Sequence, residues 1–167
     1  GWFAASVNAN QKIFNYEYFA NQTPADTVFN NVNAGDVAGS LSSGGTADSD
    51  GYIWYKYVST GTDISIDTPL NIGSRKVILF VESGNVNINA PINLTDGQGF
   101  FMLIVGKTAS ATKGNIVVAS TVGGTAYDLE GIYMADGTFQ TGSAATSLNV
   151  RGSVTGYDGI TMQRDLG

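Results

Sequence analysis

The stretch DISIDTPLNI (Asp63–Ile72) recurs in altered form as NVNINAPINL (Asn85–Leu94), 22 residues further along the chain. Each copy has a polar turn residue, an apolar–polar–apolar triplet, a linker that ends in proline, and a second short triplet. An internal period of about 20–50 residues is typical of solenoids, in which each coil covers the apolar face of the next. The repeat therefore predicts a stack of β-coils.

Further strands extend this pattern in both directions. The apolar runs Val77–Val81 and Phe101–Val105 match at an offset of 24, and their composition is typical of strands buried on both faces. From residue 51 onward we count about four units, each with about three short strands in roughly 22–30 residues. We therefore expect an all-β fold, a right-handed parallel β-helix of about four coils. An antiparallel β-sandwich is the alternative, but it gives no reason for the same turn chemistry to recur at a constant offset.

Matching positions of successive coils should lie above one another. The polar residue before each central strand should join a ladder of side-chain hydrogen bonds, in the order Asp63, Asn85, Asn115 and Thr138. The apolar residues of these strands should form inward stacks, namely Ile64, Ile66, Val86, Ile88, Ile116, Val118 and Phe139.

Residues 1–50 differ from the solenoid that we expect over residues 51–167. About the first 35 are rich in aromatic residues and asparagine, which suits a cap over the open apolar end of a coil stack. Within them, Lys12–Phe19 fits a strand or a short helix, and its composition favours a strand or an irregular cap. The glycine- and serine-rich stretch 37–51 predicts a loop. Both parts should belong to one structural domain.

The composition excludes several kinds of chemistry. The chain has 167 residues, a formal net charge of −6, and neither cysteine nor histidine. Disulfides, iron–sulfur clusters, cysteine nucleophiles and Ser-His-Asp triads are therefore impossible. The negative charge disfavours nucleic acid as a partner. The sequence contains no run of about 20 apolar residues, the length needed to span a bilayer. We expect no cofactor.

Three stretches in the last third of the chain resemble a known type of protein. They are Leu129–Gly142, Leu148–Val154 and Met162–Leu166, and the likeness extends to Arg75–Leu94. Over roughly residues 70–166 the chain thus resembles uncharacterised bacterial cell-surface proteins that form right-handed β-helices. The resemblance implies a structural or adhesive role, and it assigns no catalytic or binding residue.

Polysaccharide-active β-helices are the main enzymatic alternative, because they gather carboxylates and a basic residue on one open face. The candidates are Glu130, Asp136, Arg151 and Arg164, all in the last predicted coil. These residues can equally form ion pairs at strand ends, which contribute little to stability. Four coils would also make only a short groove, so we expect a non-enzymatic protein.

Two other clusters suggest binding. Trp54, Tyr55 and Tyr57 resemble a platform on which sugar rings stack, although strict alternation places Trp54 and Tyr55 on opposite faces. Packing beneath the N-terminal segment is the other interpretation. Asp48 and Asp50 resemble the start of a calcium loop, but the downstream glutamate is absent, which favours an ordinary Asx turn and no metal.

The sequence thus favours a structural or adhesive module, secreted or displayed on a bacterial surface, that assembles end to end into filaments or an envelope layer. Its partners would be further copies of itself or a host-surface glycan or protein. A carbohydrate-binding or carbohydrate-cleaving β-helix is the first alternative, and a trimeric fibre or spike module is the second. The chain opens without a signal region, which suits a processed product or a segment of a longer protein.

Overall fold

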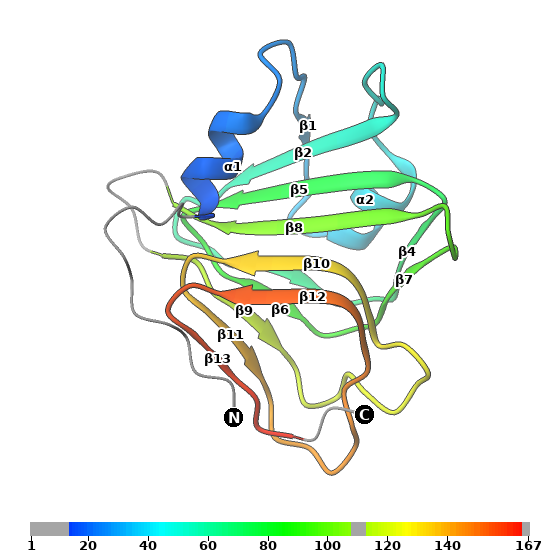
Figure 1. The fold of residues 1–167 in the computed structure, drawn as a ribbon, viewed down its shortest axis with the longest axis vertical. Helices are drawn as coiled ribbons and strands as arrows, with labels where there is room; N and C mark the ends of the chain where they lie inside the picture. Colours follow the sequence, from blue (N-terminus) through cyan, green and yellow to red (C-terminus); the bar gives the residue numbers. More distant parts are fainter. Residues whose placement is uncertain (1–13, 108–112, 165–167) are drawn as a thin grey trace.

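Parallel strands make up most of the molecule. The computed structural model describes residues 14–107 and 113–164. Within these ranges all paired strands run in parallel, and they stack as a β-solenoid of about five turns (Figure 1). The expected solenoid is therefore confirmed, and the antiparallel sandwich is excluded.

Each coil begins with a long strand and continues through shorter ones. The first coil contains β2 (Tyr52–Val58), β3 (Ile64–Ile66) and β4 (Leu70–Gly73), and the second contains β5 (Lys76–Glu82), β6 (Val86–Ile88) and β7 (Ile92–Leu94). The third contains β8 (Phe100–Gly106) and β9 (Ile116–Val118), and the fourth contains β10 (Leu129–Ala135) and β11 (Thr138–Thr141). The fifth contains β12 (Val150–Gly156) and β13 (Gly159–Thr161).

The long strands β2, β5, β8, β10 and β12 lie side by side and form one wall of the solenoid (Figure 1). A second wall has the order β13-β11-β9-β6-β3. The short strands β4 and β7 form a third side, which joins the first wall where Ile92 pairs with Leu129. Three strands per coil, as expected from the sequence, are therefore found in the first two coils, whereas the last three coils have two strands each within the described residues.

The solenoid has about five turns, one more than the sequence predicts. The first strand of the fifth turn, β12, pairs with β10 along its whole length, from Leu129↔Val150 to Ala135↔Gly156. Only Val150 and Val154 of this strand pack against the interior, and they are partly buried. Because glycine and polar residues fill the other positions, the apolar pattern is too weak to mark a separate coil.

The two decapeptide copies lie directly above each other. Ile64 pairs with Val86 and Ile66 pairs with Ile88, in the register that the repeat predicts. The solenoid interior contains all seven residues expected in the inward stacks, each with at most 1% of its surface exposed: Ile64, Ile66, Val86, Ile88, Ile116, Val118 and Phe139.

The polar residues at the start of the second wall are connected by hydrogen bonds. The Asn85 amide donates to the Asp63 carboxylate at 3.0 and 3.1 Å, and the Asn115 amide donates to Asn85 Oδ1 at 3.1 Å. The Thr138 hydroxyl then donates to Asn115 Oδ1 at 3.0 Å. The backbone N–H groups of Asn85, Asn115 and Thr138 bond to the same oxygens, so each coil is tied to the next at this corner.

Two helices precede the solenoid, and both correct the sequence-based expectation. Helix α1 (Tyr16–Gln22) occupies much of the stretch assigned to a strand or irregular cap, and α2 (Val37–Ser43) lies in the predicted loop. Each has a side-chain N-cap, because Asn15 accepts from the Tyr18 N–H and Asp36 accepts from the Gly39 N–H. Residues 1–13 of the expected cap lie outside the described residues.

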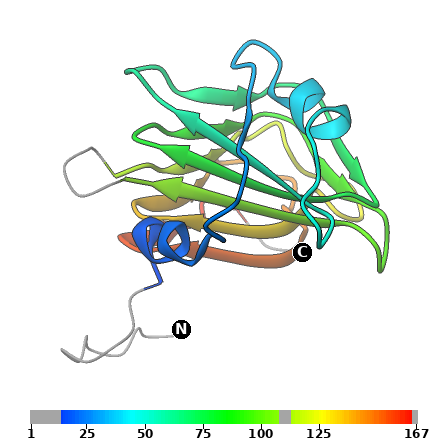
Figure 2. The ribbon, with the colours of Figure 1, turned by 90° about the horizontal axis from the view of Figure 1, so that it is seen from above.

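The helices cover different parts of the solenoid (Figure 2). Helix α2 lies against β3 and β4, and its Val37, Ala38 and Leu41 are buried in the interior cluster at the first coil. Helix α1 contacts β8 from outside. Burial, rather than intrinsic helix propensity, explains why the seven-residue segment VAGSLSS is helical. No helix in the described ranges has the length and apolarity needed to cross a membrane.

Candidate functional site

The outer face of the first wall carries a second apolar cluster, separate from the interior. Its buried members are Tyr16, Ile78, Phe80, Ile104 and Met134. Because side chains alternate along a strand, Ile78 and Phe80 point outward while Val77, Leu79 and Val81 point inward. The continuous apolar run of β5 is thus buried on both faces, as its composition predicts.

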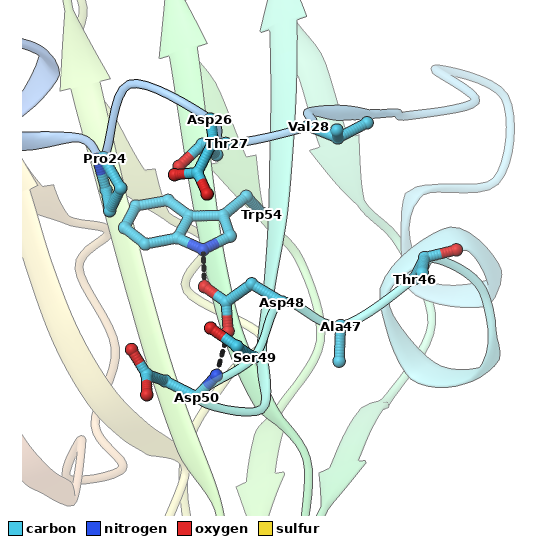
Figure 3. Close-up of a pocket in the computed structure, with 10 residues that line it drawn as sticks. All are labelled: Pro24, Asp26, Thr27, Val28, Thr46, Ala47, Asp48, Ser49, Asp50 and Trp54. Carbon is cyan, nitrogen blue, oxygen red and sulfur yellow. Dashed lines mark hydrogen bonds between the residues drawn. The ribbon is translucent and has the colours of Figure 1, made fainter.

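A pocket of about 450 Å³ lies at the edge of this outer face (Figure 3). It lies between two loop segments, 24–28 and 46–50, with the indole of Trp54 from β2 as its aromatic wall. Such a volume falls within the range of roughly 300–1,000 Å³ found for small-molecule sites. Strand alternation places Trp54 here, since Ile53 and Tyr55 on either side face the interior.

Asp48 fixes the orientation of the Trp54 ring. Its Oδ2 accepts the indole N–H at 2.7 Å, and its Oδ1 accepts the backbone N–H of Asp50 at 2.9 Å (Figure 3). The same Oδ1 accepts the backbone N–H of Tyr52 at 2.9 Å. The bond from the indole and the backbone N–H donors lower the pKa of the Asp48 carboxyl below its usual value of 3.8, because they stabilise the charged form. Asp48 is therefore a carboxylate at neutral pH.

Asp48 forms an Asx turn, in which its side chain accepts hydrogen bonds from backbone N–H groups of later residues. The bonds to Asp50 and Tyr52 use one oxygen of the carboxylate, and the indole occupies the other. Across the described residues, no group of three or more acidic, histidine or cysteine side chains is arranged to hold a metal ion. The Asp48 carboxylate thus acts as a turn residue, and within the described residues no third ligand converges on Asp48 and Asp50.

The three aromatic residues proposed as a platform do not share a face. Tyr55 is 1% exposed in the interior, where its hydroxyl donates to the Ser40 carbonyl at 2.7 Å. Tyr57 packs partly against the same interior. Of these three residues, only Trp54 could therefore stack on a sugar. The aromatic neighbours of Trp54 on the outer face are Tyr52, Phe29 and Phe80.

Of the four residues considered for catalysis, Glu130 and Arg151 contact each other, whereas Asp136 and Arg164 bond to other parts of the chain. Glu130 on β10 lies beside Arg151 on β12 and forms an ion pair with it, and Arg151 also pairs with Asp96. The bond to Asp96 and the charge of Glu130 raise the pKa of Arg151, so this guanidinium stays charged. The second Glu130 oxygen accepts the Leu94 N–H at 2.7 Å. Every oxygen of this buried carboxylate therefore faces a donor within the protein.

Asp136 and Arg164 stabilise the chain elsewhere. Asp136 accepts the N–H groups of Tyr16 at 2.7 Å and Lys107 at 3.3 Å, which ties the start of α1 to β10. The Arg164 guanidinium donates to the carbonyls of Ala119, Ser120 and Val122.

The spacing of the two acidic candidates also argues against a catalytic pair. Glu130 lies near the start of β10 and Asp136 directly follows its end, so the two are about 20 Å apart at the usual rise of a strand. The paired carboxylates of glycoside hydrolases are separated by only about 5–9.5 Å. The structure does not bring Glu130 and Asp136 together.

Several pocket residues had no signal in the sequence. Asp26, Thr27 and Thr46 come from loops without repeat or motif, and they reach the pocket only because the N-terminal segment folds back over β2. Comparison of the chain with protein-family models, with curated proteins and with solved structures finds no match.

Proposed function

We propose that this chain is a non-enzymatic structural module of a secreted or surface-displayed protein, and that it joins a second copy of itself through its C-terminal coil. The observation that carries the proposal is the outer edge of β12. Seven residues long, this edge has no strand partner among the described residues. Unpaired strand edges readily pair with another chain.

Alternation along β12 identifies which backbone groups are available. The Asn149 carbonyl accepts from the Leu129 N–H at 3.2 Å, and the Tyr157 N–H donates to the Ala135 carbonyl at 2.9 Å. Odd-numbered residues therefore direct their N–H and C=O groups toward β10, and even-numbered ones direct them outward. The outward set comprises Val150, Gly152, Val154 and Gly156.

A two-fold axis through Ser153 would bring two such edges into full register. Gly152 would then lie opposite Val154 of the second copy, and the two would exchange backbone hydrogen bonds as an antiparallel pair does. Arg151, the one charged residue of β12, would lie opposite Thr155 rather than another arginine. Like charges facing each other would oppose pairing, and this register avoids them.

The sequence of β12 also lacks the usual protection of an edge. It contains neither proline nor lysine, and the Arg151 side chain lies over Glu130 and Asp96 of preceding coils. Edge strands that must stay unpaired commonly carry such residues. Their absence from β12 supports a role in pairing.

The opposite end of the solenoid favours pairs over open filaments. The outer edge of β2 is already bonded by β1 (Asn30–Asn31) and by the Asp48 N–H, and α2 covers the interior. Head-to-tail stacking would require these segments to move. A tail-to-tail pair leaves them in place and closes the assembly at two copies.

The test is sedimentation equilibrium over a range of concentrations. We expect the mass to rise from 17.4 kDa toward twice that value. Val154→Pro should prevent pairing, because it removes an outward N–H without removing one that bonds to β10. Val154→Ala is the matched control, since it shortens the same side chain and keeps the N–H.

Circular dichroism of both variants should show the β-structure of the unmodified chain, which separates loss of pairing from loss of folding. A protein that stays monomeric at all concentrations would contradict the proposal. A threefold mass would instead support a fibre module, and a mass that grows without limit would support a filament.

A further inference from the structure

The Trp54 pocket contains a flat apolar surface that is held in position before any ligand arrives. The indole N–H is bonded to Asp48 at 2.7 Å, and one ring face stacks on Phe80 with an interplanar angle of 19°. Phe29 packs edge-on against the same indole. Because the ring cannot rotate freely, a ligand that stacks on it does not have to pay for ordering it.

Polar side chains without partners among the described residues line the same pocket. The side chains of Asp26 and Asp50 line the pocket, are exposed, and make no hydrogen bond or ion pair within the described residues. The hydroxyls of Thr27, Thr46 and Ser49 also line it and make no such contact there. The pocket therefore offers two strong acceptors and three groups that can donate or accept.

The charge of these groups limits the class of ligand. Among the described residues no lysine or arginine lines the pocket, and two free carboxylates would repel phosphate, sulfate or uronic acid groups. A small cation remains possible on charge alone, because it could lie over the indole. However, an ammonium group needs only a point charge, whereas the polar groups here are spread around a volume of about 450 Å³.

We propose that this pocket binds a neutral saccharide. The C–H face of a sugar ring would stack on Trp54, and adjacent hydroxyls would donate to the carboxylates of Asp26 and Asp50. The threonine and serine hydroxyls would complete the contacts at the rim. This proposal uses no residue of β12, so it is independent of whether two copies pair.

Intrinsic fluorescence gives a direct test, because the chain has only two tryptophans, Trp2 and Trp54. In a Trp2→Phe background, Trp54 is the single indole and reports on its own surroundings. Cellobiose, maltose, lactose and chitobiose would be titrated as probes, with tetramethylammonium chloride as the cationic probe. We expect a saturable change with at least one disaccharide and none with tetramethylammonium.

Substitutions identify the groups that bind. Asp26→Ala and Asp50→Ala should each weaken binding about tenfold, as expected when a hydrogen bond to a charged group is lost. Both positions are exposed, so the fold should tolerate the change. Tyr157→Ala is the matched control: it removes an aromatic side chain that is 48% exposed at the other end of the solenoid, and binding should be unchanged.

Three results would overturn the inference. The first is a lack of response to every disaccharide, and the second is saturable binding of tetramethylammonium in their place. The third is undiminished sugar binding by the Asp26→Ala/Asp50→Ala double variant. Each measurement should be made at a concentration where the mass is that of a monomer, so that failure here does not bear on pairing.

Discussion

The two ends of the solenoid are built differently. At the first coil, α2 inserts Val37, Ala38 and Leu41 into the interior, and β1 pairs with the outer edge of β2. At the fifth coil, the described residues provide neither a helix nor a strand beyond β12 and β13, and Ile160 is 46% exposed. The interior at the first coil is therefore covered by other parts of the protein. The fifth coil instead resembles a surface that another coil would cover.

Each end nevertheless uses an arginine to collect backbone carbonyls. Arg75 donates to the carbonyls of Leu41 and Gly44, at the end of α2. Arg164 donates to three carbonyls in the loop after β9. The difference is in what is held: Arg75 fastens a separate cap, whereas Arg164 fastens the last coil to an earlier one. Both ends are thus anchored by an arginine, but only the first coil has its apolar interior covered by a helix of the described residues.

The sharpest way to break this comparison is to remove an apolar side chain from each end. Leu41→Ala should reduce the free energy of unfolding by about 2–5 kcal/mol, because Leu41 is fully buried and leaves a cavity. Ile160→Ala should change it by no more than about 0.5 kcal/mol, since this residue is largely exposed. Urea denaturation measures both values. Equal losses would show that the fifth coil is as well covered as the first.

Replacing the two arginines should have smaller and strictly local effects. Arg75→Met and Arg164→Met should each cost about 1–3 kcal/mol, because charged hydrogen bonds to carbonyls are lost. Hydrogen exchange should accelerate in residues 37–43 for the first variant and in β13 for the second. Lysine at either position keeps the charge but loses the forked geometry, so it should rescue only partly. Exchange that spreads to both ends in one variant would contradict independent anchoring.

The smallest expected effect is the response of Asp48, at the first coil, to acid. Since the folded-state pKa of Asp48 lies below 3.8, its stabilising bonds are complete above that value and are lost only as pH falls through the lowered pKa. Trp54 fluorescence, read in the Trp2→Phe background, should therefore have a transition below pH 3.8. Asp26 and Asp50 also line this pocket, so Asp48→Asn is the control. A transition that persists unchanged in this variant would show that it does not come from Asp48.

The stacked coils could be predicted because the same pattern of apolar and polar residues recurs in the sequence. Ile64 and Val86 occupy equivalent positions in the two decapeptides, and stacking then fixes their register. The helices could not be found this way, although Asn15 and Asp36 are good N-cap residues. Helix α2 contains glycine and three serines, so its helical state depends on burial of Leu41 in a core that only the folded solenoid provides.

The candidate site was predictable only in part. Alternation along β2 places Trp54 and Tyr55 on opposite faces, but it cannot tell which face is interior. The structure places Tyr55 inside and Trp54 outside. Asp26 and Thr27 approach Trp54 through a loop whose path is set by contacts of α1 and β1 with the solenoid, and no local pattern encodes such a path.

The ladder from Asp63 through Asn85 has a consequence for how such a protein changes over generations. A coil receives its bonds from the neighbour 22 residues away, and it offers the same groups to the next one. Duplication of one such segment in the gene would lengthen the molecule by a layer and leave both termini of the stack as they are. Size is thereby separated from the surfaces at the ends, and selection can adjust either without disturbing the other.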